Sequence, residues 1–350
     1  MARKPRSNNN TLVDAGEDAD GPARPVFREA IYRAADGLRL SARDYGNPLS
    51  PWLPVVCLAG FTRDSRDFHE LASHLSTHRH RPRRVVAFDS RGRGRSEWAQ
   101  SAESYNLLTE MNDALDGMAA LNIPRAVVVG TSRGGIIGML MGLARPATVA
   151  GLVLNDVGPV IEAQGLMRIK TYVGRTPQPN DWADAAHILS RIHAAGFPSW
   201  RDVDWDYYAR LTFKDDGDRP VSAYDAKLAQ TLDGIEPGET LPAMWEEFRA
   251  LKDIPILSIR GEHSDLLSAA TVARMSGEHP QVETVTVAGE GHAPLLRYGQ
   301  VLARVSAFVT AIEGNGPPAD AIIPRDEAGY DLDAVAEPET TDVESAEQAG

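Results

Sequence analysis

A turn between a buried strand and a helix constrains the fold of this chain more than any other feature. The apolar run Ala126–Val129 ends at Gly130, and the pattern Gly-x-Ser-x-Gly then leads into a second apolar segment. Such a turn is crowded, so the serine, Ser132, is forced into a strained backbone, and Gly130 and Gly134 must lack side chains. The turn exposes the Ser132 hydroxyl above a sheet and directs the first helical N–H groups toward whatever bonds to it.

Short strands and helices alternate on both sides of this turn. An antiparallel hairpin is predicted over 28–44, because Asp36 and Gly37 favour a tight turn. The further strands are predicted at 54–59, 84–88, 126–129, 151–154, 255–259 and 283–287, and the helices at 68–75, 107–121, 136–141, 268–275 and 294–312. The pattern indicates an α/β fold, a mostly parallel sheet with helices on both faces.

The alternation breaks once, between residues 158 and 250. This stretch has helical patterns rich in aromatic residues. We expect it to form a helical cap inserted after the sixth strand, so that the core consists of residues 26–157 and 251–312. Residues 1–25 are polar, and the segment 313–350 holds eleven acidic side chains against one basic side chain. Both are expected to be disordered, the second as an acidic tail.

Composition narrows the range of partners. The net charge is −13, and the acidic tail carries most of it, so the near-neutral body offers no basic surface for nucleic acid. No stretch approaches the ~20 apolar residues of a membrane span, and the basic N-terminus lacks the apolar region of a secretory signal. We therefore expect a cytoplasmic protein that binds neither nucleic acid nor membrane.

Neither cysteine nor histidine placement indicates a metal or a cofactor. The one cysteine, Cys57, lies in an apolar run and is expected to be a buried thiol. His69, Glu70 and His74 are close to the zinc motif His-Glu-x-x-His, but the second histidine falls one residue too late. We predict no metal ion and no cofactor.

Ser132 needs a base to act as a nucleophile. A serine hydroxyl reacts poorly at neutral pH unless a base lies within hydrogen-bond distance and an acid orients that base. His292 follows the last predicted strand in a loop whose glycines allow it to bend toward the site. His292 is therefore the candidate base.

Three carboxylates are candidates for the acid. Asp265 lies just beyond the preceding strand, 255–259, and is the preferred candidate. Glu262 lies nearer the end of that strand. Asp156 ends the strand before the insertion and is also within reach of the base.

Acyl transfer also requires two N–H donors for the developing oxyanion, each contributing ~3 kcal/mol in other enzymes. We assign one to the backbone of Arg133, the residue after the nucleophile, and the other to the backbone of Phe61, which follows Gly60 after the strand 54–59.

The order and spacing of these motifs resemble the α/β-hydrolase fold family over about residues 28–312. The matching segments are Leu58–Phe61, Asp89–Ser96, Gly130–Gly135, Asp265 and Gly291–His292. The family order of serine, acid and histidine is met. The resemblance implies the α/β-hydrolase fold, a serine hydrolase with a helical cap, and a structural role for the loop Arg91–Ser96. Ala59 departs from the family, where many relatives have histidine.

The resemblance implies hydrolysis of a carboxylic ester, thioester or lactone through an acyl-enzyme, with a small-molecule acyl substrate; it leaves the oligomeric state open. Two alternatives stay open as well. One is hydrolysis of a C–C bond in a vinylogous diketone, and the other is a non-catalytic ligand receptor on the same fold. The serine argues against haloalkane dehalogenase and epoxide hydrolase chemistry, for which relatives use aspartate.

The Arg133 side chain has two candidate roles. It emerges from the first turn of the nucleophile helix, beneath the expected cap. In one role its guanidinium pairs with a carboxylate or carbonyl and braces the loop that holds Phe61. In the other it binds an anionic group of the substrate, for which its planar fork is suited.

Overall fold

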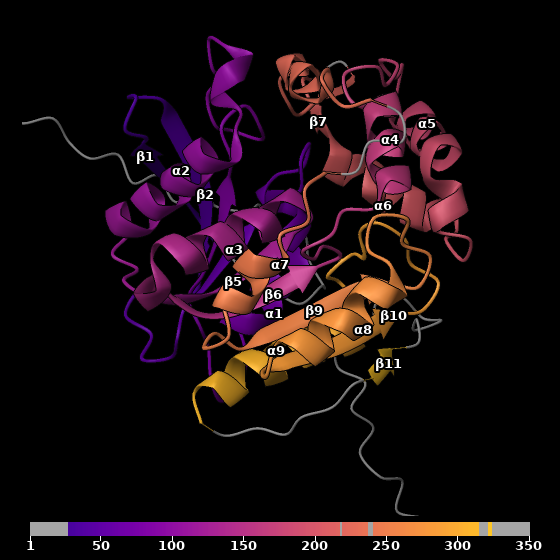
Figure 1. The fold of residues 1–350 in the computed structure, drawn as a ribbon. Coiled ribbons are helices and arrows are strands. Elements are labelled where there is room, and N and C mark those ends of the chain that lie inside the picture. Colours follow the sequence, from indigo (N-terminus) through magenta and orange to yellow (C-terminus); the bar gives the residue numbers. More distant parts are fainter. Residues whose placement is uncertain (1–26, 218, 237–240, 315–320, 324–350) are drawn as a thin grey trace, which may run out of the picture.

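A nine-stranded sheet runs through the centre of the molecule (Figure 1). The structure is a computed structural model that describes residues 27–217, 219–236, 241–314 and 321–323. The expectations for residues 1–25 and for most of 313–350 lie outside the described residues. The strands of this sheet are β1 (Phe27–Arg33), β2 (Arg39–Tyr45), β3 (Val55–Leu58), β4 (Val85–Asp89), β5 (Ala126–Thr131), β6 (Val149–Asn155), β9 (Ile256–Gly261), β10 (Val282–Val287) and β11 (Ala321–Ile323).

The sheet is mostly parallel, as the sequence predicts. Its strand order is β1-β2-β4-β3-β5-β6-β9-β10-β11, and only the pairs β1–β2 and β2–β4 are antiparallel. The predicted hairpin is present, and Gly37 in its turn has a φ of +87°. Every residue of β3, β4, β5 and β6 is buried, because helices cover both faces of this central part.

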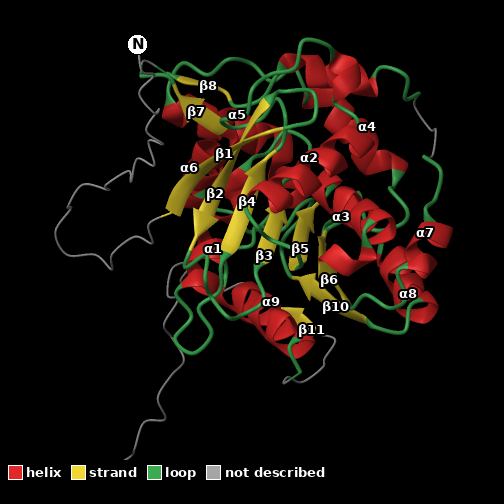
Figure 2. Cartoon of the chain, turned by 90° about the vertical axis from the view of Figure 1, so that its left-hand side faces the viewer, coloured by secondary structure: helices red, strands yellow, loops and turns green. Residues whose placement is uncertain are grey.

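Helices cover the two faces of the sheet in separate groups (Figure 2). One face packs on α1 and α9, through a cluster that includes Leu71, Leu75, Val305 and Phe308. The other face packs on α2, α3, α7 and α8. These helices are α1 (His69–Ser76), α2 (Leu107–Ala120), α3 (Arg133–Ala144), α7 (Trp245–Ala250), α8 (Ala269–Glu278) and α9 (Gly299–Ile312). The last helix begins five residues later than predicted, because the chain between 294 and 298 stays in the loop beside the candidate site.

The insertion follows β6, the sixth strand, as predicted. Its helices are α4 (Ala163–Tyr172), α5 (Trp182–His193) and α6 (Asp202–Thr212), which lie together at the upper right in Figure 1. It also contains a small antiparallel sheet of β7 (Phe213–Asp215) and β8 (Pro220–Ser222), which the sequence did not predict. At its end, Trp245 and Phe248 of α7 pack into the core cluster on α3 rather than onto the other inserted helices.

Short 3₁₀ turns lie between these elements. They are Ser65–Phe68, Ala102–Ser104, Pro146–Thr148, Ala194–Gly196 and Ala226–Leu232.

The start of the predicted acidic tail is part of the folded body, which corrects the expected boundary at residue 313. Glu313 accepts hydrogen bonds from the Leu53 N–H at 2.7 Å and from Arg83, whose side chain is 2% exposed. Further along, β11 extends the sheet by pairing in parallel with β10. The rest of that segment lies outside the described residues.

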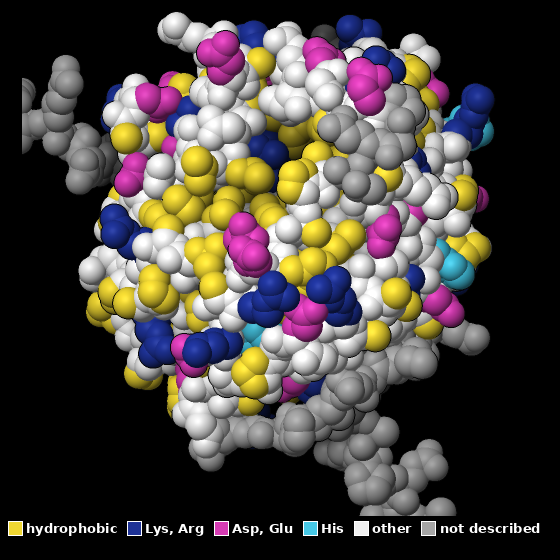
Figure 3. Space-filling model, viewed as in Figure 1, with side chains coloured by type: hydrophobic (Ala, Val, Ile, Leu, Met, Phe, Trp, Pro, Cys, Tyr) yellow, Lys and Arg dark blue, Asp and Glu magenta, His cyan; other side chains and the backbone are white. Residues whose placement is uncertain are grey.

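None of the described helices is long and apolar enough to cross a lipid bilayer. On the face shown in Figure 3, acidic and basic side chains of the described residues are interspersed rather than gathered by sign.

Candidate active site

The turn after β5 has the strained geometry expected of its sequence. Ser132 has a φ of +52°, in the left-handed region that costs a non-glycine residue about 1–3 kcal/mol. A Cβ at Gly130 would lie 2.4 Å from the backbone of Gly134, and one at Gly134 would lie 2.0 Å from the Leu58 carbonyl oxygen. Only glycine fits at either position. The close packing of β5, α3 and β3 therefore holds the serine at the tip of the turn.

His292 lies against this serine. Its Nε2 atom is 3.0 Å from Ser132 Oγ, and its Nδ1 atom is 2.8 Å from Asp156 Oδ2. The histidine comes from the loop between β10 and α9, and its side chain is 7% exposed. The predicted contact between Ser132 and His292 is present, and the partner on the other side of the imidazole is Asp156.

Asp156 follows β6 and is completely buried. Its φ of +56° turns the carboxylate back toward the end of the sheet. Oδ1 accepts the Gly261 N–H at 2.8 Å, and Oδ2 accepts the Ser264 hydroxyl at 2.6 Å in addition to the contact with His292. These donors fix the carboxylate in the orientation that contacts the imidazole.

The prediction that Asp265 contacts His292 is wrong. Asp265 instead binds Arg168 of α4 with both oxygens, at 2.5 and 2.8 Å. Burial raises the pKa of Asp265, but the hydrogen bonds and charge of Arg168 outweigh that effect and lower it. The other alternative, Glu262, has a half-exposed side chain that accepts the Gly289 N–H.

The order of the strands explains why Asp156, and not Asp265, contacts His292. β6 is the immediate neighbour of β9, so the residue that follows β6 lies next to the loop that follows β9. Asp265 lies four residues beyond the end of β9, where the chain has already turned toward the inserted helix α4. The sequence signal for Asp156 was its place directly at the end of an apolar strand.

The two proposed oxyanion donors lie beside the serine. Arg133 is the first residue of α3, where backbone N–H groups have no partner within the helix. The Gly60 carbonyl accepts the Arg63 N–H at 3.1 Å. Because carbonyl and N–H point in opposite directions across a trans peptide, this bond turns the Phe61 N–H the other way. Gly60, Phe61 and Ser132 line one pocket.

An arginine pair fixes the loop that carries Phe61. Arg93 Nε donates to the Phe61 carbonyl at 2.8 Å, and the Arg133 guanidinium lies 5.3 Å from the centre of the Phe61 ring. Both arginines bind the buried carboxylate of Glu110 on α2. Arg133 also donates to the Tyr105 carbonyl at 3.0 Å. Sequence reasoning missed Glu110 and Arg93.

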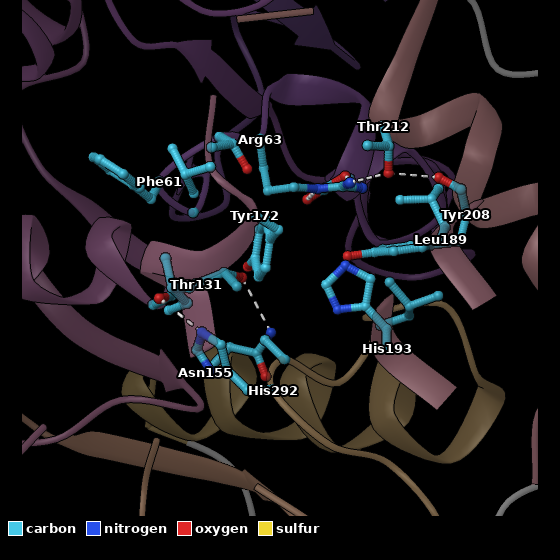
Figure 4. Close-up of a pocket in the computed structure, with 18 of the residues that line it drawn as sticks. Phe61, Arg63, Thr131, Asn155, Tyr172, Leu189, His193, Tyr208, Thr212 and His292 are labelled. Carbon is cyan, nitrogen blue, oxygen red and sulfur yellow. Dashed lines mark hydrogen bonds and ion pairs between the residues drawn. The ribbon is translucent and has the colours of Figure 1, made fainter. Parts of the chain in front are cut away.

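The pocket and its opening to solvent together span about 880 Å³. The pocket lies between the carboxyl end of the sheet and the inserted helices (Figure 4). Apolar side chains from both parts line it, together with hydroxyl, imidazole and guanidinium groups. The inserted residues that line it include Ile169, Tyr172, Val173, Thr176, Leu189, His193, Tyr208 and Thr212.

The charged groups of the pocket compensate one another. Arg63 binds both oxygens of Asp67 at 2.6 and 2.9 Å, and both side chains are 12% exposed. Burial raises the pKa of Asp67, and the charge of Arg63 opposes that rise. Among the described residues, no group of three or more His, Cys, Asp or Glu side chains is arranged to hold a metal ion.

The chain is similar to known hydrolases along most of its length. Residues 55–305 match the family model described as "Alpha/beta hydrolase family". A 3-hydroxybutyrate-oligomer hydrolase of Cupriavidus necator is 35% identical over 266 residues, which are 73% of this chain and 87% of the relative. A 2-(acetamidomethylene)succinate hydrolase of Mesorhizobium japonicum is 28% identical over 262 residues, which are 73% of this chain and 85% of that relative.

A solved structure agrees with these sequence matches. The crystal structure of an alpha/beta hydrolase from Novosphingobium aromaticivorans superposes with a TM-score of 0.75 and 36% identity, covering 83% of this chain and 99% of that one. The fold, the match to the family model and the similarity to these relatives all indicate the same family. The chain therefore belongs to the alpha/beta hydrolase family.

Proposed function

We propose that this hydrolase cleaves carboxylic esters through an acyl-enzyme formed on Ser132. The observation that carries the proposal is the continuous chain of contacts from Ser132 Oγ to His292 and from His292 to Asp156. A serine within 3.0 Å of an imidazole that a buried carboxylate orients is the arrangement used for nucleophilic acyl transfer.

In the proposed reaction, Ser132 Oγ attacks the ester carbonyl carbon while its proton moves to His292 Nε2. The carbonyl oxygen becomes an oxyanion, and the Phe61 and Arg133 N–H groups stabilise it. The C–O bond then breaks, and His292 gives the proton to the leaving alcohol. Water attacks the acyl-enzyme with His292 again as the base, which releases the acid and restores Ser132. Asp156 holds the imidazole in the required tautomer and stabilises its charged form.

The ester class has support from one relative. The Cupriavidus necator protein, 35% identical, is named for hydrolysis of 3-hydroxybutyrate oligomers, which are linear esters. The apolar part of the pocket lining here suits an acyl chain.

The first prediction concerns the nucleophile. We expect Ser132→Ala to abolish turnover of p-nitrophenyl esters and labelling by a fluorophosphonate. Its thermal unfolding should match the wild type, because the serine side chain fills no part of the apolar core. The readouts are initial rates across an acyl-chain series and intact-protein mass spectrometry. Labelling that persists in Ser132→Ala would contradict the assignment.

The same measurements separate the alternatives. A ligand receptor would bind esters and take at most one label per chain without repeated turnover. A C–C bond hydrolase would turn over a vinylogous diketone far faster than any ester of the series.

A further inference from the structure

One polar side chain in the pocket has no role in the proposed acyl transfer. His193 is the last residue of α5 and is 6% exposed. It lines the pocket that also contains Ser132 and His292, but from the inserted helices (Figure 4). The imidazole therefore belongs to the part of the pocket wall that the inserted helices supply.

The imidazole of His193 is held in place by aromatic rings. Tyr172 of α4 and Tyr208 of α6 contact it edge-on, with ring centres 5.0 and 5.7 Å away. Figure 4 shows the imidazole next to both tyrosines. Residues of three inserted helices thus hold the imidazole in one position, and a binding group held in this way loses little conformational entropy when a ligand binds.

The Nδ1 atom of His193 is buried and has no hydrogen-bond partner among the described residues. Leaving a buried polar atom unpaired costs free energy, so an apolar side chain of similar shape would be more favourable there if packing were its only role. Because His193 lines the substrate pocket, a ligand bound there can supply the missing partner.

The surroundings of His193 favour an uncharged partner. Burial lowers the pKa of His193 to about 3, with the positive charges of Arg168 and Arg63 adding to the effect, so the ring is neutral. Arg63 is compensated by Asp67, whose carboxylate also lines the pocket and would repel an anion. A hydroxyl group both donates and accepts, and so pairs with a neutral imidazole in either tautomer.

We propose that His193 is a specificity-determining residue that hydrogen-bonds a hydroxyl group of the substrate, so that the enzyme prefers hydroxylated esters. This inference rests on the proposed ester hydrolysis and names the substrate class of the same pocket. Such a bond discriminates between substrates, because a substrate that lacks the hydroxyl leaves the buried nitrogen unpaired.

The test compares two pairs of esters that differ by one hydroxyl. In one pair, p-nitrophenyl 3-hydroxybutyrate and p-nitrophenyl butyrate, the hydroxyl is on the acyl side. In the other, 2-hydroxypropyl butyrate and propyl butyrate, it is on the alcohol side. We expect wild type to favour the hydroxylated member of one pair by about tenfold in kcat/KM, and His193→Leu to lose that preference.

His187→Leu is the matched control, because His187 lies on the same helix but is exposed. We expect it to keep the preference. At pH 7.5, His193→Leu should unfold at the same temperature as wild type or a higher one, since it removes an unpaired buried atom. His193→Asn, which restores a polar group, should recover part of the preference.

Three results would overturn the proposal: no preference in the wild type for either pair, equal loss on both members in His193→Leu, or a lower unfolding temperature of that variant. The last two would give the histidine a packing role. Absence of ester turnover and of Ser132 labelling in the wild type would instead show that the proposed function fails.

Discussion

At the scale of single residues, the sequence predicted Asp265 as the partner of the His292 imidazole, whereas Asp156 occupies that place. Ser132 and His292 could be predicted because each stands in a glycine-containing loop with a local pattern. Several carboxylates, by contrast, follow strands at the same edge of the sheet. Which one reaches the imidazole depends on the path of the loop after β9, where Asp265 pairs with Arg168 of α4, a residue far away in sequence.

The second prediction ranks the two carboxylates. We expect Asp156→Asn to lower kcat by about 10⁴, because an amide favours the wrong imidazole tautomer. Asp265→Asn should leave kcat within about tenfold, because Asp265 pairs with Arg168 and not with His292. Steady-state rates on one ester measure both. The reverse order would return the acid to Asp265.

The third prediction concerns stability and pH. His193 takes up a proton near pH 6.5 when unfolded but only near pH 3 when folded. The unfolded state then binds more protons, so the free energy of unfolding falls as the pH falls from 6.5 toward 3. When the pH falls from 7.5 to 5.5, the free energy of unfolding of His193→Leu should decrease by about 1.4 kcal/mol less than that of wild type. Urea unfolding at the two pH values measures this, and His187→Leu should behave as wild type does.

At the scale of secondary structure, the alternating strands and helices were predictable, and the side-chain contacts between them were not. Apolar runs and helical spacing identify the core strands and helices one by one. Glu110 appears in the sequence as one acidic residue in a helix with a polar face. Only the packing of α2 on α3 makes it the shared partner of Arg93 and Arg133. The β7–β8 hairpin was missed because its strands span three residues each.

The fourth prediction concerns the contacts of Arg133 with Glu110 and Phe61. Arg133 binds Glu110 and lies against the Phe61 ring, and these contacts are the ones that the first of its two candidate roles requires. We therefore expect Arg133→Gln to lower kcat/KM equally for a neutral ester and for one with a distal carboxylate. Losses confined to the charged ester would favour an anion-binding role.

Glu110→Gln provides the companion measurement. It leaves two buried or half-buried guanidinium groups without their carboxylate, so we expect a loss of ~3 kcal/mol in stability. Activity at low temperature, where the variant is folded, should fall as it does in Arg133→Gln.

At the scale of the whole molecule, charge composition gave the wrong limit for the folded body. Counting acidic residues placed Glu313 in a tail, but Arg83 and Arg81 bind it, and its oxygen accepts a backbone N–H of residue 53. A compositional boundary cannot detect such a residue, because the ion pairs of a single side chain do not change the average composition of a segment.

The fifth prediction separates Glu313 from the residues C-terminal to Gly314. We expect Glu313→Gln to destabilise the protein by ~3 kcal/mol, since it leaves the buried Arg83 side chain uncompensated. A chain that ends at Gly314 should lose little, because β11 adds only three residue pairs to the sheet. Thermal unfolding and ester turnover of both proteins measure this. A large loss in the shortened chain would mean that the residues after Gly314 stabilise the body by more than the three pairs of β11 account for.

Because of the position of Asp156, the return of enzyme activity during refolding shows when the second half of the sheet has assembled on the first. Its carboxylate is held by groups C-terminal to the insertion, Gly261 and Ser264, and it meets a histidine that comes later still. An intermediate in which only the strands up to β6 have assembled would contain the nucleophile but no oriented base. During refolding from denaturant, recovery of turnover should therefore coincide with the docking of β9 and β10 on β6 and lag behind the collapse of the first half of the chain.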